Sequence, residues 1–322
     1  MNKQDDSHIL HEVCIIVPIR NEGKYVEAAV QSLIRASRDM AKIIIIDDGS
    51  TDETSVTLEK FQDSIEVIRT EGIGASASRN AALARTERQF IAFTDGDCIV
   101  DEDWLVELVK GISSMDETVV AVGGPQLVFP QSKWKERLHA DILHSMHFVS
   151  DYLHQQPQMV KVNHNPTCNV MYKREALVEV GGFDTSLWPC EDLDLDIRLS
   201  KAGYQFYCTP TAKVMHRRPE SFAGFCSMMN RYGMAHGKLF HKHHRFQNVD
   251  LISLSILCAL IWAIWSGLAS LLWLILGILV GFWVLFSLKI GLLRAVLASG
   301  YFMIPFFLWN FSFYIQLIRG KK

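Results

Sequence analysis

Two carboxylates at the end of an apolar run carry the clearest chemical signal in this chain. Asp95 and Asp97 directly follow the apolar run 90–94, which predicts a buried strand. Residues two apart at the carboxyl end of such a strand leave the sheet at the edge where open α/β sheets bind ligands. Carboxylate oxygens suit Mg²⁺ or Mn²⁺. Asp-Gly-Asp is also common in ordinary turns, so the triplet alone leaves a turn and a metal site open.

The residues around this triplet predict alternating strands and helices. Apolar runs predict strands over 13–17, 43–46, 65–68 and 90–94. Helical spacing predicts a helix over 22–36, a second helix is expected over 53–61, and 72–85 predicts a glycine turn that leads into an Ala-rich helix. This alternation is typical of βαβ units in a parallel sheet. Each strand is followed by a polar cluster, namely 20–22, 47–48, 72–74 and 95–97. Ordinary helix caps do not account for four clusters on one rim of the sheet, so a ligand site is expected there.

A second acidic segment begins at Glu191 and predicts the start of a helix. Asp192 and Asp196 are four residues apart and share one helical face, and Asp194 can pair with Arg198 one turn later. Carboxylates in a first helical turn often interact only with the helix dipole, which suits Asp194 and Asp196. Residues 168–171 predict a further strand, followed by a short helix.

The apolar residues are concentrated at the C-terminus. Of the 322 residues 49% are hydrophobic, and no Asp, Glu, Lys, Arg or His occurs over 251–288 or 295–318. About twenty apolar residues cross a bilayer, so we expect spans over 251–268, 270–288 and 295–318, with a turn at Ser266-Gly267. A buried apolar hairpin is the alternative, and Pro305 could break the last span. The predicted domains are therefore 1–245, which carries the polar clusters, and 246–322, which lies in the membrane.

Charge predicts the orientation in the membrane. The stretch 1–12 is polar and acidic, so we expect no signal peptide and a cytoplasmic first domain. Lys238, Lys242 and Arg245 precede the first span, as the positive-inside tendency requires, which indicates a multi-pass protein of the cell (inner or plasma) membrane. The net charge of -3 gives no sign of nucleic-acid binding. The seven Cys contain no CxxC pair and are interpreted as reduced core residues.

Several blocks in a fixed order resemble the inverting family 2 glycosyltransferases of GT-A fold. The blocks cover roughly residues 12–240 and are 16–22, 46–52, 74–80, 95–97, 181–184 and 191–195. The resemblance implies an α/β, Rossmann-like GT-A domain, here followed by an all-α transmembrane region.

The resemblance also implies roles for individual residues. Contacts with the nucleotide are implied for Pro18, Asn21, Glu22, Asp48, Gly74, Arg79 and Asp95. Asp97 matches the stronger ligand of Mg²⁺ or Mn²⁺, and Asp95 its partner nearer the ribose. Asp192 matches the family's general base, which takes the proton of the acceptor hydroxyl during in-line attack. The metal neutralises the leaving diphosphate, so no protein acid is needed.

The sugar and acceptor side is less sharply defined. Gly182 and Glu191 are implied in the sugar pocket. His216 is a third metal ligand or a cationic clamp, with a surface basic cluster as the equal alternative. Arg231 lies where processive synthases of the family carry Gln-x-x-Arg-Trp, but Met228 and Tyr232 depart from that motif, which favours transfer of a single sugar.

The helix that contains Arg231 carries an aromatic stripe over 222–240. Because this stripe leads into an apolar segment, we expect a helix along the bilayer surface, with a buried core helix as the alternative.

Together these features predict a metal-dependent inverting glycosyltransferase. It would move one sugar from a nucleotide-sugar to a membrane-embedded, polyprenyl-linked acceptor in cell-surface glycan or exopolysaccharide biosynthesis. A small processive polysaccharide synthase is one alternative. A catalytically inactive nucleotide-sugar-binding membrane subunit is another, against which the presence of both Asp97 and Asp192 argues.

Overall fold

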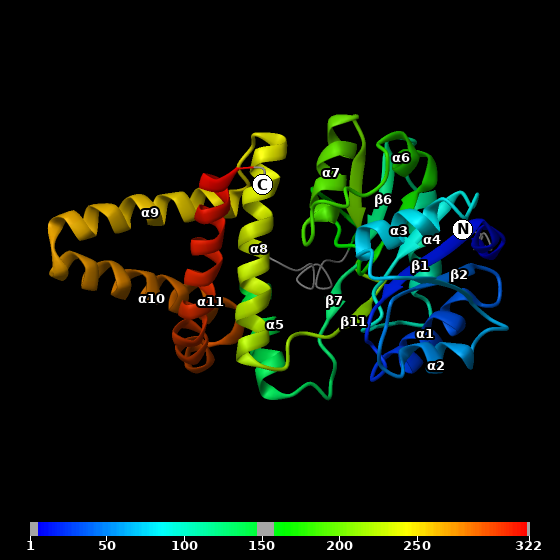
Figure 1. The fold of residues 1–322 in the computed structure, drawn as a ribbon, viewed down its shortest axis with the longest axis horizontal. Coiled ribbons are helices and arrows are strands. Elements are labelled where there is room, and N and C mark those ends of the chain that lie inside the picture. Colours follow the sequence, from blue (N-terminus) through cyan, green and yellow to red (C-terminus); the bar gives the residue numbers. More distant parts are fainter. Residues whose placement is uncertain (1–5, 147–157, 321–322) are drawn as a thin grey trace. The chain divides into compact units, whose positions relative to one another are not determined.

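The computed structural model describes residues 6–146 and 158–320, which form two compact units (Figure 1). The first unit contains described residues up to 131 and the segment 158–217. The second contains 132–146 and 218–320. The predicted domain boundary after residue 245 stays a prediction.

The first unit is built on an eight-stranded mixed sheet in the order β3-β2-β1-β4-β9-β6-β10-β8. Its strands are β1 (Val13–Ile19), β2 (Lys42–Asp48), β3 (Glu66–Thr70), β4 (Phe90–Phe93), β6 (Val119–Gly123), β8 (Val160–Val162), β9 (Val170–Lys173) and β10 (Gln205–Cys208). The four predicted strands form a parallel group, β3-β2-β1-β4. By contrast, β9 runs antiparallel to both β4 and β6. The expectation of a parallel sheet is therefore correct for β1 to β4, and β6 and β10 are also parallel to each other, whereas β9 and β8 run in the opposite direction. An apolar run does not reveal the direction of its strand.

Helices cover both faces of this sheet. One face packs against α1 (Val26–Ser37), α2 (Thr54–Glu59) and α4 (Trp104–Ser113), and the opposite face against α3 (Ala75–Leu83), α6 (Arg174–Glu179) and α7 (Glu191–Lys201). A 3₁₀ helix, η1 (Asp6–Glu12), precedes β1. Alternate residues of β1 point into the two cores, with Ile15 on one side and Ile16 on the other. Strands buried on both faces read as continuous apolar runs, which is why the sequence located them.

A small second sheet carries part of the rim. It consists of β5 (Cys98–Val100), β11 (Val214–His216) and β7 (Gln126–Leu127), in the order β5-β11-β7. β11 runs antiparallel to β5 with His216 opposite Cys98. This register brings a residue from late in the chain to the Asp95–Asp97 turn.

The second unit is helical. Its helices are α5 (Trp134–Ser145), α8 (Phe222–His243), α9 (Asn248–Ser266), α10 (Leu268–Ile290) and α11 (Leu292–Arg319). The stretches Asn248–Ser266, Ala269–Ile290 and Leu292–Arg319 are long and apolar enough to cross a membrane. Gly267 joins α9 to α10, as predicted, and α11 continues through Pro305 over its 28 residues. Three candidate spans are therefore present, and the break proposed at Pro305 is not seen in this helix.

The aromatic stripe of α8 packs against α11 inside the second unit. Phe225 is 0% and Met229 is 1% exposed. A Cβ on Gly233 would lie 2.1 Å from the carbonyl oxygen of Trp309, so only glycine allows this close approach. The buried part of the stripe faces α11, as the alternative of a core helix requires. The expected position of α8 along the bilayer surface stays a prediction.

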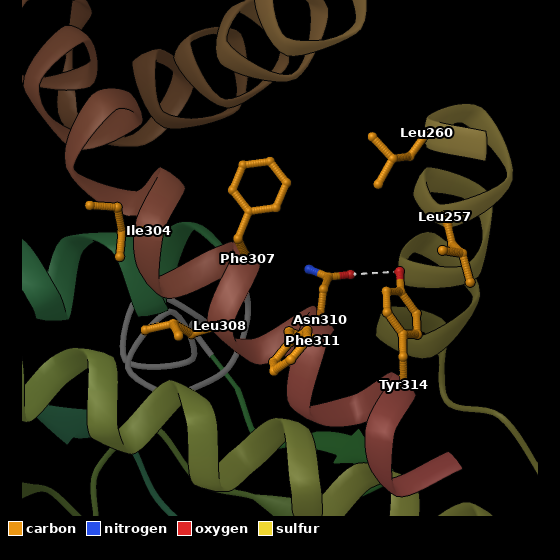
Figure 2. A pocket seen from close by; sticks show the side chains of 8 residues that line it. All are labelled: Leu257, Leu260, Ile304, Phe307, Leu308, Asn310, Phe311 and Tyr314. Atoms are coloured by element: carbon orange, nitrogen blue, oxygen red, sulfur yellow. Dashed lines mark hydrogen bonds between the residues drawn. The ribbon is translucent and has the colours of Figure 1, made fainter. Parts of the chain in front are cut away.

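An apolar groove of about 460 Å³ lies between α9 and α11 (Figure 2). Leu257, Leu260, Phe307 and Phe311 are among the side chains that line it. At its polar end the Tyr314 hydroxyl lies 3.0 Å from the Asn310 side-chain oxygen.

Candidate active site

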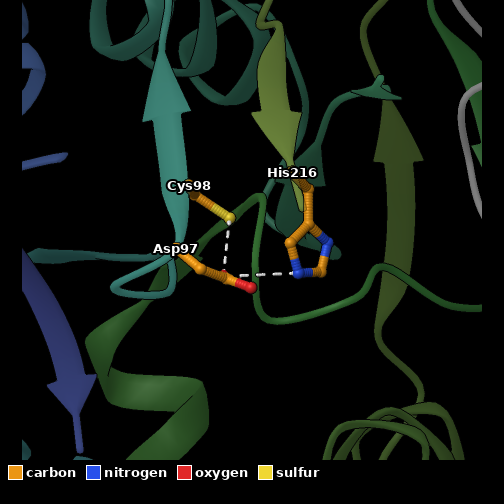
Figure 3. Close-up of side chains that lie close together, drawn as sticks. All are labelled: Asp97, Cys98 and His216. Carbon is orange, nitrogen blue, oxygen red and sulfur yellow. Dashed lines mark hydrogen bonds and ion pairs between the residues drawn. The ribbon is translucent and has the colours of Figure 1, made fainter. Parts of the chain in front are cut away.

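Asp97 and His216 meet at the rim of the first unit. The Asp97 Oδ1 atom lies 3.4 Å from Nε2 of His216 and 3.7 Å from Sγ of Cys98. Figure 3 shows these three side chains turned toward one another, and their potential ligand atoms all lie within 4.8 Å of each other. The imidazole of His216 is half-buried beside a carboxylate, where it could bind a metal ion, and its role as a ligand stays a prediction.

The chemistry of these atoms selects which of them can hold a cation. Burial raises the pKa of the Cys98 thiol well above its usual value of 9.0, so at neutral pH it is a protonated thiol and a poor ligand. Nδ1 of His216 lies 3.2 Å from the side-chain oxygen of the buried Gln126. With Nδ1–H donating to that oxygen, the Nε2 lone pair faces Asp97. One carboxylate and one imidazole are therefore oriented together.

Arg79 ties the Asp95 turn to the start of α7. Its guanidinium is 3% exposed and donates to Asp95 Oδ1 at 2.9 Å and to Glu191 Oε1 at 2.8 Å. Burial raises the pKa of Glu191 to about 7, and the charge of Asp192 adds to this while Arg79 opposes it. Arg79 thus joins two acidic segments of the chain, and its predicted contact with the base or diphosphate stays a prediction.

A third carboxylate faces the same turn. Burial and the nearby charges of Asp97 and Asp95 together raise the pKa of Glu22 to about 7. Three carboxylates gathered at one rim disfavour their own ionisation, and a bound cation would relieve that repulsion.

The other residues implied at the nucleotide also lie on this rim, where they shape its loops. Asp48 is buried, and its carboxylate accepts from Thr70 Oγ1 at 2.6 Å, Ile73 N at 2.7 Å and Gly74 N at 2.8 Å. These bonds hold the glycine turn, where Gly74 has φ +91°, a conformation that favours glycine. Direct contact of Asp48 with a nucleotide stays a prediction.

The first-strand loop is braced in a similar way. The Asn21 side-chain oxygen accepts from Thr51 N at 2.8 Å, and Pro18 lies within β1 opposite Ile46. The rim therefore presents two fixed loops on either side of the β1 end.

Asp192 lies in the first turn of α7 and its side chain is 21% exposed. Its Oδ1 accepts from the Leu193 N–H at 2.8 Å, and its Oδ2 lies 3.8 Å from Nε2 of His164. The predicted pair between Asp194 and Arg198 is confirmed, with Nε 2.8 Å from Oδ2. Sequence reasoning missed His164, because it lies in a loop without periodicity. The available signal was that Asp192 and Asp196 share a helical face, so that one side chain could reach both.

The residues expected around the sugar and acceptor belong to different units. Gly182 has φ +69°, and a Cβ there would lie 2.6 Å from Oδ1 of Asn80, so the turn beside α7 requires glycine. Arg231 belongs to α8 in the second unit, where its guanidinium donates to Ser227 Oγ at 2.8 Å. Glu191 and Gly182 lie in the first unit.

Comparison with known proteins identifies the family. The model of glycosyl transferase family 2 matches residues 14–181, just over half of the chain. A pre-mycofactocin glycosyltransferase of Mycobacterium tuberculosis is 27% identical over 84% of this chain and 56% of the relative. A poly-beta-1,6-N-acetyl-D-glucosamine synthase of Staphylococcus aureus is 22% identical over 72% of this chain and 57% of the relative. The chain spans little more than half the length of these curated relatives.

Solved structures agree on the fold. The mannosyltransferase PcManGT from Pyrobaculum calidifontis, solved with GDP-Man and Mn²⁺, matches with a TM-score of 0.66 at 18% identity, covering 97% of this chain and 88% of that one. GalNAc-T7, solved with UDP, GalNAc and Mn²⁺, matches with a TM-score of 0.52 at 17% identity, covering 72% of this chain and 51% of that one. The catalytic fold is therefore GT-A, as predicted. The chain belongs to glycosyl transferase family 2.

Proposed function

We propose that this protein is a metal-dependent inverting glycosyltransferase that transfers one sugar from a nucleotide-sugar to a membrane-embedded acceptor. The observation that carries the proposal is the pairing of Asp97 with His216 at 3.4 Å. A second, separate carboxylate, Asp192, lies on α7. Arg79 connects the two segments. One metal site and one base are the minimum that such a transfer requires.

Asp97 and His216 would hold the metal, with Asp95 beside them. When bound, Mg²⁺ or Mn²⁺ would neutralise the charge that develops on the leaving nucleoside diphosphate. A donor set of carboxylate and imidazole suits Mn²⁺ better than Mg²⁺, which prefers oxygen ligands. The presence of Mn²⁺ in the complexes of PcManGT and GalNAc-T7 supports the same choice.

Asp192 would act as the general base. Its partial exposure leaves the carboxylate within reach of an incoming hydroxyl. The proton of the acceptor hydroxyl moves to Asp192 as the hydroxyl oxygen attacks the anomeric carbon, and the bond to the diphosphate breaks on the opposite face. Attack from the opposite face inverts the configuration at that carbon.

The helical unit supports a membrane-embedded acceptor. Three helices are long and apolar enough to cross a membrane, and the basic residues before α9 favour a cytoplasmic catalytic unit. A polyprenyl-linked saccharide in the cell membrane, on the way to a surface glycan, fits this arrangement. The similarity to a polysaccharide synthase keeps a small processive synthase as a second candidate, which the length of the product distinguishes.

The test begins with nucleotide-sugars screened for thermal stabilisation of the detergent-purified protein in Mn²⁺, in Mg²⁺ and in chelator. A ligand that binds the folded state raises its stability by mass action, so one donor should stabilise the protein only with metal. That donor is then incubated with polyprenyl-phosphate and polyprenyl-diphosphate saccharides. A single added sugar supports the proposal, and a ladder of products supports the synthase. Binding without transfer to any lipid or soluble acceptor would indicate an inactive subunit.

A further inference from the structure

Behind the proposed base lies a buried carboxylate that the proposed reaction does not use. Asp196 is 0% exposed and accepts hydrogen bonds from His164 Nδ1 at 2.8 Å, Asn165 N at 2.9 Å and Tyr172 Oη at 2.7 Å. A buried carboxylate is costly unless it is hydrogen-bonded. Three donors distributed over its two oxygens hold it in one orientation, and this in turn fixes the ring of His164.

The other ring nitrogen of His164 faces Asp192. With Nδ1–H bonded to Asp196, Nε2 lies 3.8 Å from Oδ2 of Asp192. Burial lowers the pKa of the His164 imidazole, but the charges of Asp192 and Asp196 and the bond to Asp196 outweigh it and raise the pKa to about 9. Cys168 is the further titratable group near the ring, and Tyr172 reaches it only through Asp196. At neutral pH the ring is an imidazolium between two carboxylates.

We infer that His164 is a positioning residue for the proposed base. Anchored by Asp196, its positive charge attracts Oδ2 of Asp192 from 3.8 Å, beside the Thr167 N–H that donates to the same oxygen at 3.5 Å. The two together orient the carboxylate toward an incoming proton. His164 itself exchanges no proton with the substrate: the acceptor's proton moves to Asp192. The inference rests on the proposed function, since it requires Asp192 to be the base.

A purely structural role makes a different prediction. The loop of His164 is also fastened by Asn165, whose side-chain N–H donates to the carbonyl oxygen of Tyr207 at 3.0 Å. If His164 only ties this loop to α7, then loosening the loop by Asn165→Ala should reproduce the effect of removing His164. If His164 acts on Asp192, removing His164 should lower turnover without weakening the binding of the nucleotide-sugar, because the residues proposed to bind the metal and the nucleotide lie on other segments.

The experiment compares His164→Gln, His164→Ala and the control Asn165→Ala in the full-length, detergent-purified protein. His164→Gln keeps a side-chain N–H that can donate a hydrogen bond to Asp196 but carries no charge. His164→Ala has no hydrogen-bond donor and no charge. We expect kcat to fall by about 10- to 100-fold, as for other displaced catalytic groups, and more for Ala than for Gln. The donor KM and the Mn²⁺-dependent thermal shift should stay within about twofold, because uniform binding is retained. Asn165→Ala should keep most of the parent kcat.

The pH profile provides a second readout that a structural tie would not change. The parent kcat should decline as pH rises through about 9, where the imidazolium loses its proton. His164→Gln should be slower than the parent below about pH 9 and should lack that decline, so the two rates should converge at higher pH. The inference is overturned if both His164 variants keep kcat within twofold, or if Asn165→Ala matches them. Failure of the proposed function looks different: the parent then transfers no sugar, or Asp192→Asn stays active.

Discussion

Replacing Arg79 by Met tests the link between the metal turn and the base helix. The guanidinium is 3% exposed and bonds Asp95 and Glu191 at 2.9 and 2.8 Å, so its removal leaves two carboxylates without a counter-charge. Breaking a buried pair in this way costs about 3–5 kcal/mol. Two charge-assisted hydrogen bonds at about 1.5–3 kcal/mol each give about 3–6 kcal/mol, which overlaps this range. Because Asp95 is 30% exposed, water compensates part of its lost interaction with Arg79. We therefore expect Arg79→Met to lower the free energy of unfolding by about 3 kcal/mol.

The pH dependence of this loss has a definite sign. Burial and Asp192 raise the pKa of Glu191 from 4.5 to about 7, so the folded state binds this proton more tightly than the unfolded state. The contribution of Glu191 to stability therefore falls as pH rises from about 4.5 to 7. Without Arg79 that pKa rises further, and protonation then relieves the uncompensated charge at a higher pH. The deficit of Arg79→Met relative to the parent should be smaller at pH 6 than at pH 8.

The assay is urea unfolding of the full-length protein. Hydrogen exchange of the β1 and β4 amides reports the unfolding of the first unit. Adding Glu191→Gln to Arg79→Met should recover on the order of 1 kcal/mol or more, because it removes one unpaired charge. Arg69→Met is the matched control: its pair with Glu59 is 57% and 65% exposed, so the change should cost less than about 1 kcal/mol. An Arg79→Met variant within 1 kcal/mol of the parent at pH 8, or with equal deficits at both pH values, would refute this reasoning.

Four further outcomes are expected. Asp192→Asn should lower turnover on the order of 10² to 10⁴ while donor affinity stays within a few-fold, and near-normal turnover would eliminate the role of base. Asp97→Ala should weaken nucleotide-sugar binding in Mn²⁺, and chelator should weaken it in the parent protein. Binding that is unchanged in both cases would contradict the metal site. Gly233→Leu should destabilise the helical unit by about 1–3 kcal/mol or more, because its Cβ would lie 2.1 Å from the Trp309 carbonyl oxygen, and an unchanged thermal midpoint would show that α8 can shift. A cysteine added after Lys322, which lies outside the described residues, should react with an impermeant reagent from the outer face of intact cells if all three helices span; labelling only after lysis would contradict three spans.

The sequence by itself determined the features that depend on neighbours along the chain. Apolar runs located β1, β2 and β4 because strands buried on both faces lack polar positions. The pair of Asp194 with Arg198 followed from helical spacing alone. The absence of charge over 251–288 was enough to expect two long helices joined near Gly267. Each of these results rests on a period of a few residues, which one sequence shows directly.

Tertiary structure alone decided what depends on residues far apart in the chain. β9 enters the sheet antiparallel, and no apolar pattern encodes that direction. Arg79 reaches Glu191 across 112 positions, and His164 meets Asp192 and Asp196 only because its loop passes over α7. Such contacts follow from how strands and helices pack in three dimensions. The sequence could therefore name the carboxylates of the candidate site. Only the fold could show that the side chains of Arg79 and His164 lie between them.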